Sequence, residues 1–390
     1  MATLSLRTAF ACLVLVLAVT PNVSAAAQAA PSSLRADEVR SIRDRLVAET
    51  AAGRFSGAVL IAKDGRPLYQ EAFGLADNDR KIPNTLDTQF RFGSIGKLFT
   101  EIAIMQLAQA GKIDVTASLG RYIPDYPNRD VAAKVTINEL MTHSGGTGDE
   151  FGPVFDAHQS ELLDPKDYIA LFGSAPAQFP PGSRQEYSNF GMMILGRVIE
   201  NASGLRYADY VERHIFRVAG MTSTGNVAES INLPKRSVRY MTVNGVLEPA
   251  TVNATLRLRG TPAAHGYIPL KGGPDGGGYS TVGDFLRFAV ALKANRLLDP
   301  EHTQLLLAGT APMPTGDAYH YDMGGPLPGG GRFIGHAGAG PGQSAILRIF
   351  PDGYVVAVMA NRDQPLAFEL LDFIAGELPG TNHIPARPAR

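Results

Sequence analysis

Cysteine is almost absent from this sequence of 390 residues, which contains only Cys12. That residue lies in a segment with the features of a signal peptide: Arg7 is positively charged, Thr8 to Val19 forms an apolar run, and small residues suitable for cleavage follow. The sequence therefore predicts a signal peptide over residues 1–29 and a secreted or periplasmic protein. A retained anchor is the alternative, but the apolar run is too short to span a bilayer, so we expect no membrane span in the mature chain.

Removal of Cys12 excludes disulfides, thiolate nucleophiles and cysteine-ligated metal sites. The eight histidines include no His-x-x-x-His or His-x-His pair, and phosphate-binding loops and dinucleotide fingerprints are missing, so we expect no metal and no cofactor. The 36 basic and 37 acidic residues give a net charge of −1, which indicates neither a nucleic-acid partner nor a polybasic membrane anchor. The absence of a Gly-x-Ser-x-Gly motif argues against an ordinary α/β-hydrolase.

What the sequence does contain is enough apolar material for a large core, since 45% of its residues are hydrophobic. A helix predicted over Ser33 to Ala52 precedes two apolar runs joined by Asp64-Gly65, a dipeptide typical of tight hairpin turns. Strand patterns and a final helix return near the other end of the chain, at 332–337, 344–350, 354–359 and 366–378. This order predicts an α/β (α+β) fold in which both chain ends build one antiparallel sheet flanked by helices.

The middle of the chain is mostly helical in pattern and predicts an inserted lobe. We expect a catalytic domain over 33–378, with a sheet lobe from 33–90 and 270–378 and a helical lobe over about 91–269. Helices are predicted at 165–172, 191–202, 207–216 and 281–293, whereas the roles of 147–181 and 226–273 stay open. Five glycines between Gly272 and Gly278 indicate a loop whose backbone passes close to another group.

Ser94 and Lys97 stand three residues apart at the start of a predicted helix. Residues i and i+3 share one face of a helix, which places the hydroxyl beside the amine. An amine whose pKa is lowered by desolvation can accept the hydroxyl proton, and the helix N-terminus offers free N–H groups to a developing negative charge. The pair predicts a serine nucleophile; a capping serine with a solvated lysine is the structural alternative.

Tyr187-Ser188-Asn189 lies between a proline-rich loop and a predicted helix. The phenol of Tyr187 can act as a general base, and the amide of Asn189 can hold a substrate carbonyl. Tyr126-Pro127-Asn128 has the same Tyr-x-Asn spacing, but Tyr187 is favoured because it leads into a helix N-terminus. His143 is expected to make structural hydrogen bonds near the site, since no metal spacing or mechanism requires it.

His336-Ala337-Gly338 lies in a glycine-rich run that ends at Gly342. Glycine at this density allows a substrate to lie along the backbone as an added strand. The N–H of Ala339 can then join that of Ser94 in an oxyanion hole. A glycine-rich turn with an incidental histidine is the alternative.

The order Ser-x-x-Lys, Tyr-x-Asn, His-x-Gly resembles the serine β-lactamase and penicillin-recognising enzyme superfamily, in its class C β-lactamase-like branch. Further similar segments lie at 140–146, 179–204, 276–281 and 350–353, so the resemblance covers about residues 55–363. It implies an acyl-enzyme on Ser94, proton transfer through Lys97 and Tyr187, and no cofactor. It also implies binding of substrate and oxyanion by Asn189, His336, Gly338 and Ala339.

One position departs from the β-lactamases within this resemblance. His336 stands where they have the lysine of Lys-Thr-Gly, and Ala337 replaces the threonine, so the groups that hold a β-lactam carboxylate are weakened. The expected substrate is therefore a small-molecule ester or amide, or a peptide. A D,D-peptidase, a D-aminopeptidase or a weak β-lactamase is the alternative within this chemistry, and a non-catalytic binding protein on the same fold is the alternative outside it. The sequence leaves the oligomeric state open.

Overall fold

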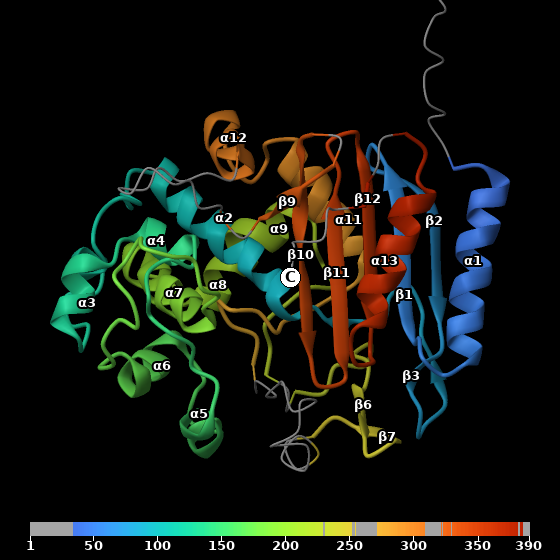
Figure 1. Ribbon diagram of the computed structural model, residues 1–390, viewed down its shortest axis with the longest axis horizontal. Coiled ribbons are helices and arrows are strands. Elements are labelled where there is room, and N and C mark those ends of the chain that lie inside the picture. Colours follow the sequence, from blue (N-terminus) through green and yellow to red (C-terminus); the bar gives the residue numbers. More distant parts are fainter. Residues whose placement is uncertain are drawn as a thin grey trace, which may run out of the picture.

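The computed structural model in Figure 1 describes residues 34–228, 231–251, 254, 271–308, 321, 323–328, 330–380 and 383–384. The predicted signal peptide, residues 1–29, lies outside these ranges. Among the helices in these ranges, none combines the length and the apolar character needed to cross a bilayer.

A six-stranded antiparallel sheet occupies the right half of Figure 1, in the order β2-β1-β12-β11-β10-β9. The pairing that joins the two chain ends is β1 with β12, which runs from Gly57 opposite Ala360 to Lys63 opposite Tyr354. The prediction of one antiparallel sheet built from both ends of the chain is therefore confirmed. The strands are β1 (Gly57–Lys63), β2 (Arg66–Phe73), β9 (Gly324–Pro326), β10 (Arg332–Gly340), β11 (Gln343–Ile349) and β12 (Tyr354–Ala360).

The hairpin between β1 and β2 turns at Asp64 and Gly65, whose φ angles are +49° and +77°. A two-residue turn of this kind needs positive φ at both central residues, which aspartate tolerates and glycine adopts freely. The tight hairpin predicted from Asp-Gly is confirmed.

Helices cover both faces of the sheet. α1 and α13 pack on one face around Val59 and Val358, while α2 and α11 lie on the other face with Leu60 and Ala357. Successive residues of a strand point to opposite faces, so the central strands are buried on both sides and show little polar alternation. The bounds are α1 (Ala36–Ala51), α2 (Gly96–Gln109), α11 (Val282–Lys293) and α13 (Leu366–Glu377).

The other helices lie mainly beside the sheet, on the left of Figure 1. They are η1 (Gly93–Ile95), η2 (Leu119–Arg121), α3 (Arg129–Lys134), α4 (Ile137–Met141), α5 (Pro153–His158), α6 (Pro165–Phe172), α7 (Asn189–Ser203), α8 (Tyr207–Val211), the π-helical turn η3 (Glu212–Phe216), α9 (Arg217–Ala219) and α12 (Pro300–Ala308). Short two-stranded pairs join β3 (Leu75–Asp77) to β4 (Ile82–Pro83), β5 (Phe90–Arg91) to β8 (Tyr279–Ser280), and β6 (Tyr240–Val243) to β7 (Val246–Pro249).

Several boundaries differ from the sequence-based predictions. α7 begins at Asn189 rather than Gly191, because Ser188 caps it and accepts a hydrogen bond from the N–H of Gly191 at 2.8 Å. β10 continues to Gly340 rather than ending at Ala337, because its glycine-rich half stays paired with β11. The helix expected over 207–216 is divided between α8 and η3, and the hairpin β6-β7 lies in a segment that the sequence left unordered.

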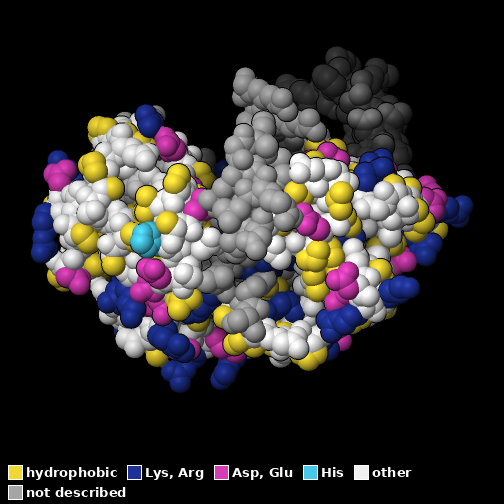
Figure 2. All heavy atoms as spheres, turned by 90° about the horizontal axis from the view of Figure 1, so that it is seen from below, with side chains coloured by type: hydrophobic (Ala, Val, Ile, Leu, Met, Phe, Trp, Pro, Cys, Tyr) yellow, Lys and Arg dark blue, Asp and Glu magenta, His cyan; other side chains and the backbone are white. Residues whose placement is uncertain are grey.

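The face of the molecule shown in Figure 2 carries basic and acidic side chains on both halves. This mixture fits the net charge of −1. The described atoms of this face therefore present no broad surface of one sign, of the kind that steers polyanions.

Candidate active site

Ser94 lies on the 3₁₀ turn η1, which leads from β5 into α2. Gly93 before it has a φ of +52°, a left-handed conformation that favours glycine. A Cβ atom at position 93 would also stand only 3.0 Å from the backbone nitrogen of Ala339. Ser94 is therefore half-buried at the place where η1 packs against β10.

Lys97 is completely buried, and its amine lies among polar acceptors. Its Nζ donates to Ser94 Oγ at 3.2 Å, to Asn189 Oδ1 at 2.6 Å and to the backbone oxygen of Asp275 at 2.5 Å. The alternative of a solvated lysine is wrong. The amine instead lies in contact with the Ser94 hydroxyl.

Tyr187 lies beside the same amine. Lys97 Nζ stands 4.8 Å from the centre of the Tyr187 ring, and this ring stacks on His143 with centroids 4.7 Å apart. Tyr187 is 45% exposed, so the residue is open to molecules from outside. The alternative tyrosine, Tyr126, is 1% exposed within the hydrophobic core, and Asn128 beside it caps α3, which excludes that pair from the site.

The backbone of β10 passes directly beside Ser94. A Cβ atom on Gly338 would lie 1.9 Å from the carbonyl oxygen of Phe92 and 2.9 Å from the nitrogen of Ser94, so only glycine fits. On the edge away from β11, β9 pairs with β10 only at residues 332–334. In the described part of the chain, no strand pairs with residues 337–340 on that edge. A substrate that binds as an added strand needs such an unoccupied edge.

His336 lies on β10 opposite Leu347 of β11 and is partly exposed. Residues i and i+2 of a strand share a face, so His336 is on the same face as Gly338, which meets η1. Its Nδ1 contacts the carbonyl oxygen of Ala337. The structure therefore brings the predicted residues of β10 to one side of the Ser94 turn.

The glycine-rich loop from Gly272 to Gly278 packs against the Ser94 turn from another direction. The N–H of Gly277 donates to the carbonyl of Gly93 at 3.1 Å, and a Cβ on Gly276 would lie 2.3 Å from that oxygen. The prediction that this backbone passes close to another group is confirmed, because the group is the Ser94 turn itself. The same loop supplies the Asp275 carbonyl to Lys97.

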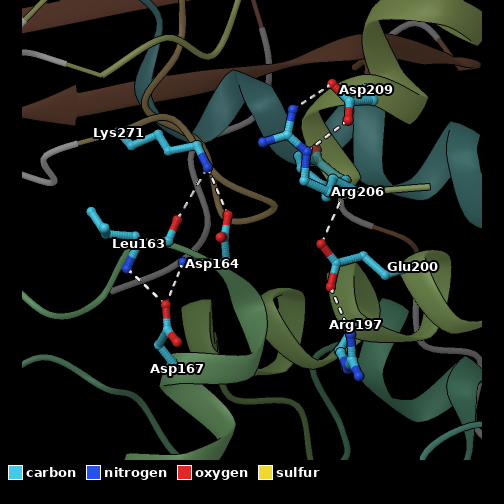
Figure 3. A network of polar contacts seen from close by, with 9 residues as sticks. Leu163, Asp164, Asp167, Arg197, Glu200, Arg206, Asp209 and Lys271 are labelled. Atoms are coloured by element: carbon cyan, nitrogen blue, oxygen red, sulfur yellow. Dashed lines mark hydrogen bonds and ion pairs between the residues drawn. The ribbon is translucent and has the colours of Figure 1, made fainter. Parts of the chain in front are cut away.

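A network of ion pairs and hydrogen bonds fixes the segment that leads into this loop, as Figure 3 shows. Lys271 Nζ lies 2.7 Å from Asp164 Oδ1, and the N–H of Asp164 donates to Asp167 of α6 at 2.8 Å. The segment before the loop is thereby tied to the start of α6. Further pairs in this region are Arg197 with Glu200 and Arg206 with Asp209.

His143 supports the turn that carries Tyr187. Its Nδ1 accepts a hydrogen bond from the N–H of Ser188 at 3.2 Å, and its carbonyl accepts from the N–H of Glu186 at 2.9 Å. The expected structural hydrogen-bonding role of His143 near the site is confirmed.

Asp149 contacts the site but was not singled out from the sequence. It accepts hydrogen bonds from both the backbone N–H and the side-chain Nδ2 of Asn189. Next to it, Glu150 is 2% exposed, and burial, reinforced by the nearby Asp275, raises the pKa of its carboxyl well above its usual value. No sequence signal pointed to either role, because an aspartate beside glycines is also an ordinary turn residue.

The described residues hold no group of three or more His, Cys, Asp or Glu side chains arranged to bind a metal ion. What they do bring together is a hydroxyl, an amine, a phenol and closely packed backbone N–H groups. This set of groups can perform acyl transfer to a serine.

Comparison with known proteins agrees with this chemistry. Residues 43–378 match the family model described as Beta-lactamase. The chain is 27% identical to penicillin-binding protein 4* of Bacillus subtilis, in a match that covers 86% of this chain and 75% of that protein. It is 31% identical to esterase EstB of Burkholderia gladioli, in a match that covers 64% of this chain and 68% of that protein. The crystal structure of a penicillin-binding protein from Bacillus halodurans matches with a TM-score of 0.73 at 30% identity, covering 87% of this chain and 99% of that one.

The family resemblance inferred from the motif order is confirmed by these matches. The homologues and the fold identify the protein as an enzyme, and the chain belongs to the Beta-lactamase family as a serine hydrolase of the β-lactamase and penicillin-binding protein superfamily.

Proposed function

We propose that the protein is an exported hydrolase that cleaves an ester or amide of a small molecule or peptide through an acyl-enzyme on Ser94. The observation that carries the proposal is the contact of 3.2 Å between the buried Lys97 amine and the Ser94 hydroxyl. Export rests on the signal peptide predicted over residues 1–29. The similarity to a named esterase favours an ester substrate.

In the acylation step, Ser94 Oγ attacks the substrate carbonyl while its proton passes to Lys97 or Tyr187. The oxyanion that forms accepts hydrogen bonds from the backbone N–H groups of Ser94 and Ala339. Tyr187 delivers the proton to the leaving group. Water then attacks the acyl-enzyme and releases the acid and free Ser94.

Substrate binding falls to the residues around this centre. Asn189, at the start of α7, holds the acyl-side carbonyl of the substrate, and the backbone from His336 through Gly338 lies along the substrate as the next strand. The open edge of β10 in the described structure supports this arrangement. Choice among substrates depends on side chains outside this centre, including those of segments 147–181 and 226–273.

A D,D-peptidase, a D-aminopeptidase or a weak β-lactamase is the second candidate, favoured by similarity to penicillin-binding proteins. His336 argues against efficient β-lactam hydrolysis, because an imidazole holds a carboxylate less strongly than the ammonium of a lysine does. A binding protein that has lost catalysis is a third reading of the fold. The presence of Ser94, Lys97 and Tyr187 together argues against it, because the hydroxyl and the amine are in contact and the phenol ring lies beside the amine.

Intact-mass measurement after treatment with a fluorophosphonate tests the proposal. We expect one adduct on the wild-type protein, none on Ser94→Ala, and one on the control Ser174→Ala, which removes an exposed hydroxyl. Panels of p-nitrophenyl esters, D-amino-acid peptides and β-lactams then separate the candidate substrates. An unlabelled wild-type protein, or a labelled Ser94→Ala, contradicts the proposal.

A further inference from the structure

Asn189 has an acidic partner that the mechanism above does not use. Asp149 Oδ1 accepts from the backbone N–H of Asn189 at 3.3 Å, and Oδ2 accepts from its side-chain Nδ2 at 3.2 Å. One carboxylate therefore holds the backbone and the side chain of the same residue. This double contact restricts the side-chain torsions of Asn189 as well as its position.

The contact decides which end of the amide faces Lys97. An asparagine amide has an acceptor oxygen at one end and a donor nitrogen at the other. Since Nδ2 is directed at Asp149, Oδ1 faces Lys97 and accepts from its Nζ at 2.6 Å. A flipped amide would set a donor against the amine of Lys97 and an acceptor against the carboxylate of Asp149.

Tyr187 lies beside this amine with His143 against its ring, and Asp275 supplies a backbone oxygen to it. The buried carboxyl of Glu150 interacts with the charges of Asp275 and Asp149. Glu150 is almost fully buried, and this burial raises the pKa of its carboxyl. Glu150 therefore favours its protonated, neutral form. Asp149 is the carboxylate that contacts Asn189, and it does so through both of its oxygens.

We propose that Asp149 is a positioning residue of the reaction, which holds the Asn189 amide in the orientation that engages Lys97 and so aligns the amine with Ser94. The inference rests on the proposed function, because it assumes that Lys97 moves the Ser94 proton. The effect of Asp149 reaches the reacting atoms only through its contact with Asn189 and the contact of Asn189 with Lys97.

The test uses Asp149→Asn and Asp149→Ala in the full protein, with p-nitrophenyl acetate as substrate. We expect kcat to fall by about tenfold to a hundredfold, the range that misplacement of a reacting group produces. The pH dependence of kcat/KM should also change in both variants, because the Lys97 amine loses its contact with Asn189 Oδ1. Asp44→Asn, an exposed charge on α1, is the matched control and should behave as wild type.

Unchanged kcat and pH profiles in both Asp149 variants overturn the inference. A lower unfolding temperature with an unchanged pH profile also overturns it, because that result shows a purely structural role. The crystal structure of Asp149→Ala gives a readout without activity: the Asn189 Oδ1 contact to Lys97 should be lost, and its retention overturns the inference. Failure of fluorophosphonate to label wild-type Ser94 refutes the proposed function instead, and the crystallographic result still decides the positioning role.

Discussion

Substitution of Gly338 by alanine tests whether β10 sets the geometry around Ser94. The new Cβ would stand 1.9 Å from the carbonyl oxygen and 2.8 Å from the carbonyl carbon of Phe92, and 2.9 Å from the nitrogen of Ser94. Ordinary contacts of this kind are about 3.5 Å, so the strand or the Ser94 turn has to move by about 1.5 Å. Overpacking of this type costs about 1–3 kcal/mol of unfolding free energy, and a displacement of about 1 Å at reacting groups costs about a hundredfold in rate.

Gly283→Ala is the matched control for this substitution. Gly283 lies in the first turn of α11, and a Cβ atom there would have the side chains of Arg287 and Thr281 as its nearest neighbours, at 3.7 and 3.8 Å. An alanine at this position should be neutral or stabilise by about 0.5–1 kcal/mol.

The assays for both glycine variants are urea unfolding and the rate of acylation by p-nitrophenyl acetate. Gly338→Ala should lose both stability and acylation rate, while Gly283→Ala keeps both. If Gly338→Ala matches the wild type in both measurements, the close approach of β10 to Ser94 is not as described. If its stability falls but its acylation rate does not, the strand packs on the turn without setting the reactive geometry.

Two further predictions concern buried groups near the site. His143→Ala removes the acceptor for the Ser188 N–H and the ring that contacts Tyr187. We expect urea unfolding to show a loss of about 1–3 kcal/mol in unfolding free energy, and we expect acylation to slow. The surface control His158→Ala should change neither. The pKa of Glu150 in the folded state is raised above its ordinary value of 4.5. Above pH 4.5 the folded state therefore binds more protons than the unfolded state does. The contribution of this group to stability consequently falls as the pH rises. Glu150→Gln should therefore raise the unfolding temperature at about pH 8 and change it little at about pH 4, and an equal change at both pH values would contradict this account.

Much of the fold could be predicted because the signals are local. The Asp64-Gly65 turn and the helix at 165–172 each follow from residues within a few positions of one another. The antiparallel sheet could be predicted because apolar strand patterns occur mainly near the two ends of the described chain. Such strands can bury their apolar faces only by pairing into one sheet that helices cover. Boundaries were less accurate: the cap at Ser188 and the glycine-rich half of β10 take their final form from contacts with other segments.

The candidate site was predictable as a set of residues but not as an arrangement. Motif order pointed to Ser94, Lys97, Tyr187 and the segment around His336, and the structure brings these together. Asp149 gave no signal, because its role depends only on where Asn189 lies after folding.

By itself, the sequence determined the kinds of element, the sheet built from both chain ends and the chemical types available for catalysis, because turn residues, caps and spacings act between near neighbours. Only the tertiary structure decided which groups meet. The amine of Lys97 reaches Asn189 and Asp275 across 92 and 178 positions of the chain. Contacts across such separations depend on how helices, loop and strand pack, and on the glycines that let their backbones approach, so no local pattern encodes them.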